Sequence, residues 1–151
     1  MLDEFRFRID LRVPFHDIDL LGHVNNINYL IWCETARCEY LAAVIKDQIN
    51  GRRGWIMAKQ TADYKLPLEF MEQVAVGCRI SRIGTKSFEM LYEVWSATRE
   101  QLAMHSASTI VVFDYERQHS IPFPDDWRET VLAYERVTPE IGPHLSQKVK
   151  S

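Results

Sequence analysis

Apolar and charged residues alternate at the start of the chain. Every second residue from Phe5 to Val13 is apolar, and the residues between them are mostly arginine or aspartate. A period of two is typical of a strand with one buried face. We therefore predict a strand over residues 5–13, and Pro14 limits further pairing.

The period changes after a polar, glycine-containing segment, residues 16–26. Apolar residues then recur at steps of three and four, which indicates an amphipathic helix of about Ile27 to Asp47. Either Asn25 or Asn26 could cap its N-terminus. The expected buried face consists of Ile27, Leu30, Ile31, Thr35, Cys38, Leu41, Ala42 and Ile45.

The second half of the chain returns to strand-like patterns. Short connections between consecutive strands favour antiparallel hairpins, with a turn expected at Gly84–Lys86. A short helix is predicted over Asp125–Glu135, and we expect residues 136–151 to form a flexible tail. The four strands are predicted at about 55–66, 74–83, 87–97 and 102–114.

The predicted order is strand, helix and four strands, within one domain spanning residues 1–151. One long helix must bury its apolar face against one antiparallel sheet, which gives a two-layer α+β domain. The other face of the sheet also carries apolar residues, and a second subunit is the simplest cover for them. These residues are Trp55, Leu91, Trp95 and Val111.

Composition narrows the functional class. The chain has 151 residues, of which 46% are apolar and 26% charged, with a net charge of −3. These values fit one globular domain and exclude a generally basic nucleic-acid surface. No apolar run reaches the length of about 18 residues that a membrane helix needs, and the N-terminus lacks a signal-peptide core. The three cysteines have no metal-like spacing, so we expect reduced thiols and a cytoplasmic protein.

The segment Phe15–Leu30 carries the candidate chemistry. It holds two aspartates, two histidines and three asparagines just before and within the start of the predicted helix. A helix N-terminus presents unpaired N–H groups and a positive dipole end, which can hold a developing oxyanion. A carboxylate nearby could act as a base or nucleophile toward a carbonyl. The same residues could also be only caps and turn formers.

This segment resembles the signature of the hot-dog-fold acyl-CoA thioesterases of the 4-hydroxybenzoyl-CoA thioesterase type. Their Asp-x-Asp, Gly and Asn-Tyr pattern matches Asp17–Asp19, Gly22 and Asn28–Tyr29, and His23–Asn26 is similar to the acyl-ACP thioesterase branch. Weaker similarities follow in the family's order at Glu34–Arg37, Asp63–Leu68, Ile83–Ser87 and Ile121–Pro124.

The resemblance implies a hot-dog fold, in which a curved antiparallel sheet of five strands wraps one long helix. It also implies a homodimer or homotetramer whose active sites are built from two subunits. The implied reaction is hydrolysis of an acyl-CoA or acyl-ACP thioester to a free acid and a thiol. Neither a cofactor nor a metal is implied, apart from coenzyme A as part of the substrate.

Four catalytic residues are carried over by position. Asp19, the second aspartate of the motif, is implied to attack the thioester carbonyl or to activate water. The backbone N–H of Asn26 is implied to polarise that carbonyl. His23 and Asn25 could position water or hold Asp19, although both could instead be structural. Asp17 is expected to brace the loop.

Further residues are candidates for substrate binding. Glu34 is placed on the apolar face of the helix, where it could pair with Arg37, line the pocket or, as a weaker alternative, act as the catalytic acid. The candidate walls of the acyl pocket are Tyr29, Trp32 and Tyr64, and the candidate ligands of CoA phosphates are Arg79, Arg82 and Lys86.

Two other functions stay open. A hot-dog hydratase or dehydratase would share the fold, and a non-catalytic protein that binds acyl thioesters would share the pocket. The Asp-x-Asp to Asn-Tyr block argues against the first, and the intact Asp19 argues against the second.

Overall fold

The computed structural model describes residues 2–46 and 52–142. The chain begins with strand β1, a short 3-10 helix η1, helix α1 and a π-helical turn η2, and four long strands follow. A short strand β6, helix α2 and strand β7 complete the described part. The bounds are β1 Phe7–Arg12, η1 Phe15–Asp17, α1 Asn26–Tyr40, η2 Leu41–Ile45, β2 Arg53–Tyr64, β3 Gln73–Ile83, β4 Ser87–Ser96, β5 Gln101–Asp114, β6 His119–Ser120, α2 Asp125–Tyr134 and β7 Glu140–Ile141.

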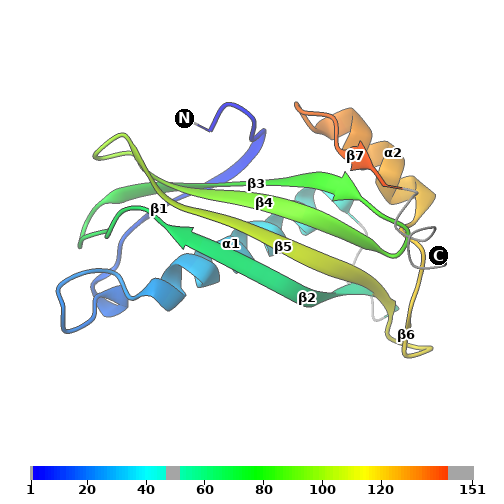
Figure 1. The fold of residues 1–151 in the computed structure, drawn as a ribbon, viewed down its shortest axis with the longest axis horizontal. Coiled ribbons are helices and arrows are strands. Elements are labelled where there is room, and N and C mark those ends of the chain that lie inside the picture. Colours follow the sequence, from blue (N-terminus) through cyan, green and yellow to red (C-terminus); the bar gives the residue numbers. More distant parts are fainter. Residues whose placement is uncertain (1, 47–51, 143–151) are drawn as a thin grey trace.

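The long strands form one antiparallel sheet in the order β1-β3-β4-β5-β2. The short strands extend it locally, with β6 beside β5 and β7 parallel to the end of β3. Helix α1 crosses one face of the curved sheet, as Figure 1 shows. This architecture confirms the predicted hot-dog fold.

Strand β2 forms one edge of this sheet. Eleven of its 12 residues pair with β5 along one side, with an irregularity at Ala58, and within the described residues no strand pairs with its other side. Ile56 and Met57 in this strand have exposed side chains. A long unpaired edge of this kind is a template for pairing with another chain.

The core lies between α1 and the facing side of the sheet. Every second residue of β4 is buried, as expected for a strand with one face in the core. Helix α1 contributes the buried residues Tyr29, Trp32, Cys33, Ala36, Arg37 and Tyr40.

The helix itself is confirmed, and its predicted face was wrong in part: Leu41 and Ile45 are buried, but several other members are not. Ile27 is 59% exposed and Ile31 48%, and Cys38 is exposed as well. The buried stripe instead includes Arg37, whose guanidinium donates a hydrogen bond to the Tyr92 hydroxyl at 3.3 Å. A pattern of apolar residues misses such a stripe, because a buried arginine and tyrosine are scored as polar. The predicted end at Asp47 lies outside the described residues.

The outer face of the sheet is partly covered by the chain itself. Leu2 and Phe5 pack there with Ala75, and the partly buried Leu91 and Trp95 join them. A Cβ at Gly77 would lie 2.7 Å from the Phe5 ring, so a glycine at this position lets the N-terminal segment approach. The apolar residues expected to need a second subunit are therefore partly covered within one chain.

Trp55 and part of the C-terminal segment lie in other places than the sequence predicted. Trp55 packs against the main core under α1 rather than on the outer face. Within the predicted tail, β7 is ordered beside β3, and residues 143–151 lie outside the described part of the chain.

Candidate active site

The aspartate-containing loop between η1 and α1 is closed by its own backbone. Ile18 and Val24 form an isolated β-bridge, and the Asp19 N–H donates to the His23 carbonyl at 3.0 Å. The Asp19 carbonyl accepts from the Gly22 N–H at 3.0 Å, and Gly22 has a φ of +82°. This left-handed conformation suits glycine because it carries no Cβ. The loop therefore holds Asp19 in a tight turn just before the helix.

The Asp19 side chain also takes part in this turn. Its Oδ1 accepts a hydrogen bond from the Leu21 N–H at 2.8 Å. Among the described residues no donor binds its other carboxylate oxygen, and the residue is only partly buried. One oxygen thus fixes the orientation of the carboxylate, and the second is available for chemistry.

Asn25 is the N-cap of helix α1. Its Oδ1 accepts from the Ile27 N–H at 3.0 Å, and its own N–H donates to the Asp17 carbonyl at 2.9 Å. The side-chain amide of Asn28 donates to the same carbonyl at 3.2 Å. Asp17 therefore braces the loop through its backbone, as predicted. Asn26 follows the cap as the first helical residue, so its N–H belongs to the first turn, where no intrahelical acceptor is available.

A cavity of about 320 Å³ opens beside this helix start. The Tyr64 hydroxyl donates to the Asn26 carbonyl at 2.9 Å, and the Tyr64 ring meets the Tyr29 ring edge-on at 5.3 Å. The cavity thus combines a helix N-terminus with an aromatic and aliphatic wall. Its lining consists of Val24, Asn26, Tyr29, Tyr64, Lys65, Leu66 and Pro67.

Tyr29 ties the helix to this wall. The buried Tyr29 hydroxyl donates to the Leu66 carbonyl and accepts from the Leu68 N–H, both at 2.9 Å. Burial raises the pKa of Tyr29, and the bond from Leu68 acts in the opposite direction. The phenol therefore stays protonated at neutral pH and can serve as both donor and acceptor.

Some predicted site residues do not line this cavity within the described chain. Asp19, His23 and Asn25 lie in the adjoining loop, which leads directly into the N-terminus of α1. Trp32 is buried and stacks on Tyr29 with ring centroids 5.5 Å apart, so it supports the wall from behind.

The predicted burial of Glu34 was wrong. Its side chain is 66% exposed and lies 3.7 Å from the Arg37 guanidinium. Glu34 is on the solvent side because the buried stripe of α1 is rotated relative to the predicted one.

The three basic residues proposed for phosphates lie elsewhere in the subunit. Arg79 contacts Glu4 at 3.4 Å and Arg82 contacts Glu140 at 4.0 Å, and both line a separate cavity of about 340 Å³. Lys86 is in the turn between β3 and β4, at the end of the sheet away from the start of α1 (Figure 1). One subunit alone therefore does not bring these residues to the helix N-terminus.

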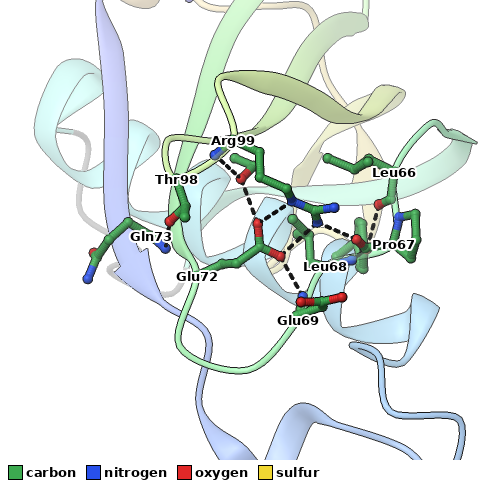
Figure 2. A network of polar contacts seen from close by, with 10 residues as sticks. Leu66, Pro67, Leu68, Glu69, Glu72, Gln73, Thr98 and Arg99 are labelled. Atoms are coloured by element: carbon green, nitrogen blue, oxygen red, sulfur yellow. Dashed lines mark hydrogen bonds and ion pairs between the residues drawn. The ribbon is translucent and has the colours of Figure 1, made fainter.

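Sequence reasoning missed an ion pair beside the cavity wall. Glu72 and Arg99 make two hydrogen bonds of 2.7 Å each, and Arg99 also donates to the Pro67 carbonyl, as Figure 2 shows. No local motif signals this pair, because its partners come from different connections of the sheet.

The described residues hold neither a metal-binding cluster nor an activated buried thiol. They contain no group of three or more His, Cys, Asp or Glu side chains that could hold a metal ion. Burial raises the pKa of Cys33 to about 12, with the nearby Arg37 acting in the opposite direction, and burial raises that of Cys78 as well. Both thiols are therefore poor nucleophiles. No helix in this part of the chain has the length and apolar character needed to cross a membrane.

Comparison with known proteins agrees with this fold. The solved structure of a Thermus thermophilus thioesterase, in complex with coenzyme A and Zn, is 30% identical and has a TM-score of 0.78; the match covers 88% of this chain and 96% of that one. The 1,4-dihydroxy-2-naphthoyl-CoA thioesterase Slr0204 of Synechocystis has the same fold, with a TM-score of 0.72, 19% identity, and coverage of 83% and 94%. The uncharacterised Bacillus subtilis protein YsmA is 23% identical over 128 residues, 85% of this chain and 86% of its own.

The sequence also matches a family profile over most of its length. Residues 13–131 match the Thioesterase-like superfamily, a range that contains the aspartate loop, α1 and the long strands β2–β5. The chain belongs to this superfamily of thioester hydrolases.

Proposed function

We propose that the protein hydrolyses acyl-CoA thioesters at the N-terminus of α1. The observation that carries the proposal is the cavity beside Asn26, walled by two tyrosines and adjoined by the Asp19 loop. In this proposal the acyl group enters the cavity, and the N-terminal end of the helix faces the thioester carbonyl. Coenzyme A is the carrier we propose, since the Thermus thermophilus relative was solved with coenzyme A bound.

The proposed chemistry uses two groups in complementary roles. The Asn26 N–H and the helix dipole stabilise the negative charge that develops on the carbonyl oxygen. In one route the free oxygen of Asp19 attacks the carbonyl carbon, the C–S bond breaks as CoA leaves as the thiolate, and water then hydrolyses the mixed anhydride to the free acid. In the other route Asp19 removes a proton from a water that attacks the carbonyl carbon, and the C–S bond breaks to give the free acid and the CoA thiolate, which takes up the proton. Asn25 holds the first turn in place as its cap, and His23 is proposed to position the water.

The substrate-binding roles follow from where the residues lie. Tyr29 and Tyr64 are proposed to contact the acyl group, and Trp32 to support Tyr29 from behind. Arg79, Arg82 and Lys86 could reach the phosphates of a CoA that is bound by a neighbouring subunit. A role of this kind predicts a raised KM with an unchanged kcat on their removal.

We also propose that the protein is a homodimer or a tetramer built from dimers. The unpaired edge of β2 and the exposed Ile27 and Ile31 support an interface at this side of the molecule. A partner at this position would cover surface next to the cavity and narrow it around the substrate.

The variant Asp19→Asn tests the reaction. Asparagine keeps an oxygen to accept the Leu21 N–H, so the loop should fold as before. Loss of the charge should lower kcat by about 10³-fold, or about 4 kcal/mol of barrier. Thiol release from a panel of benzoyl-CoA, hexanoyl-CoA and palmitoyl-CoA measures this, and Asp17→Asn is the control, with a much smaller expected loss.

The outcomes separate the alternatives. A variant at Asp19 that keeps a tenth or more of the wild-type kcat on its best substrate would exclude this assignment. Hydration of an enoyl-CoA without thiol release would favour the hydratase, binding without turnover the non-catalytic protein, and turnover of acyl-ACP alone the carrier protein as substrate.

A further inference from the structure

A carboxylate–guanidinium pair lies next to the cavity without lining it. The buried Glu72 receives both Arg99 bonds in the bidentate arrangement, with Nε donating to Oε1 and Nη2 to Oε2, each at 2.7 Å. Both oxygens have a second donor: Ser96 Oγ at 2.8 Å for Oε1 and the Glu69 N–H at 2.6 Å for Oε2. Burial raises the pKa of Glu72, but these hydrogen bonds outweigh it and leave the pKa below its ordinary value. The pair is therefore ionised and fixed in orientation at neutral pH.

The pair also holds the segment that walls the cavity. Arg99 Nη2 donates to the Pro67 carbonyl in addition to Glu72 (Figure 2). Proline has no N–H, so this carbonyl is the only backbone group through which Pro67 can be held. Pro67 lies in the connection between β2 and β3, outside the strand ladders, and the Leu66 N–H just before it donates to the Ala103 carbonyl of β5 at 3.1 Å.

The opposite side of the same segment is bonded to the start of α1. Tyr29 bridges the Leu66 carbonyl and the Leu68 N–H, and the Leu68 carbonyl accepts from the Val24 N–H at 2.8 Å. Val24 is the residue before the helix cap. The wall at 66–68 is thus held between the Glu72–Arg99 pair and the helix N-terminus.

We infer that Glu72 and Arg99 are positioning residues, which set the distance between the 66–68 wall and the N-terminus of α1. The inference rests on the proposed function, because the acyl group would lie between these two elements. Displacement of a bound reactant by about 1 Å can cost about 10²-fold in rate. Glu72 is buried but the Arg99 side chain is 35% exposed, so the pair adds little net stability, whereas its bidentate geometry is specific. We therefore expect the pair to contribute a fixed position of the 66–68 wall more than stability.

The variants Arg99→Lys and Arg99→Ala test the inference. Lysine keeps the charge but cannot make the bidentate contact and reach Pro67 together, and alanine removes both. With benzoyl-CoA as the probe, we expect kcat to fall by about tenfold for lysine and about 10²-fold for alanine, with KM within about threefold of the wild type. Circular dichroism confirms that each variant is folded at the assay temperature.

Arg52→Lys is the matched control. Arg52 contacts Asp114 at 3.5 Å, and the Asp114 carboxylate is also buried and accepts backbone N–H groups from Glu116 and Arg117 at 2.9 Å each. This pair lies at the far end of β5, away from the cavity lining. We expect Arg52→Lys to leave kcat and KM unchanged and to change stability little, because the Arg52 side chain is 54% exposed.

Amide hydrogen exchange gives a readout that does not depend on activity. The Leu68 N–H should exchange at least about tenfold faster in Arg99→Ala than in the wild type. Without Arg99 the 66–68 segment should move more freely, and the bond from the Leu68 N–H to the Tyr29 hydroxyl should open more often. It should be unchanged in Arg52→Lys.

The outcomes are distinct. An active wild type, with Arg99 variants that are folded and keep its kcat, would overturn the inference and leave the proposed function intact. A wild type that hydrolyses no thioester would overturn the proposed function and, with it, the positioning role of the pair. Unchanged Leu68 exchange in Arg99→Ala would show that the pair does not hold the wall.

Discussion

Removal of one buried hydroxyl should measure how firmly the cavity wall is attached to the helix. The variant Tyr29→Phe deletes the oxygen that accepts from the Leu68 N–H and donates to the Leu66 carbonyl, both at 2.9 Å. The ring keeps its stacking on Trp32 and its edge contact with Tyr64. The change therefore isolates the two hydrogen bonds from the packing.

The magnitude follows from the burial of the two groups. Leu68 is fully buried, so its N–H would lose its partner without gaining water, at a cost of about 1–3 kcal/mol. Leu66 is only partly buried, and water can replace part of its bond. We expect the free energy of unfolding to fall by about 2–3 kcal/mol. A domain of this length should then lose about 4–12 °C in Tm.

Urea unfolding at one fixed subunit concentration measures the effect, since association would otherwise change the apparent stability. Tyr64→Phe is the control: its hydroxyl donates to the Asn26 carbonyl at 2.9 Å but the side chain is 44% exposed, so the loss should stay below about 1 kcal/mol. The reasoning is refuted if Tyr29→Phe costs no more than Tyr64→Phe, or if the m-value changes enough to explain the difference.

Two further predictions concern other parts of the molecule. Burial raises the pKa of Glu135, against the hydrogen bonds from the Tyr40 hydroxyl and the Ile80 N–H. The native state thus binds the proton of Glu135 more tightly than the unfolded state does. The stability that protonated Glu135 contributes is therefore lost as the pH rises from the ordinary glutamate pKa of about 4.3 through the higher pKa of the native state. Relative to the wild type, Glu135→Gln should therefore become more stable between about pH 4.5 and about pH 7.5 in urea unfolding, and a difference that is constant with pH would contradict this. At the edge of β2, Ile56→Lys should weaken dimerisation at least about tenfold, as measured by sedimentation equilibrium. The fold should change little, because the side chain is 40% exposed in the subunit. A wild type that sediments with the monomer mass of 17.7 kDa would contradict the dimer itself.

The strands were predictable because their signal is local. Alternation and the turn at Gly84–Lys86 placed β3, β4 and β5 within about one residue of their ends. The turn at Asp19 and the side-chain cap at Asn25 are also local, since the bonds of Asp19 with Leu21, Gly22 and His23 and of Asn25 with Ile27 join residues two to four positions apart.

Features that depend on distant contacts could not be predicted in the same way. The buried face of α1 includes Arg37 because Tyr92 and Ser108, on β4 and β5, provide polar partners under the helix. Glu72 and Arg99 are 27 positions apart and meet only after β3 and β4 have paired. The carboxylate of Glu135 reaches β3 from the end of α2. In each case the sequence alone shows a polar residue but not the hydrogen-bond partner that offsets the cost of burying it.

The strand order determines when the site can form during synthesis. The segment from β1 to β2 holds the aspartate loop and α1, yet its outer strands pair with β3 and β5, where Phe7 faces Cys78 and Arg53 faces Asp114. Tyr64 ends β2 and Asp114 ends β5, a gap of 50 residues, so at about 5–20 residues per second a ribosome needs about 3–10 s to add the missing partner. Through that interval β2 has no complete partner strand, whereas β1 has its partner once β3 is made. The meander β3–β5 should fold first from its local hairpins, and the Asp19 loop should become ordered last, when the first half docks on it.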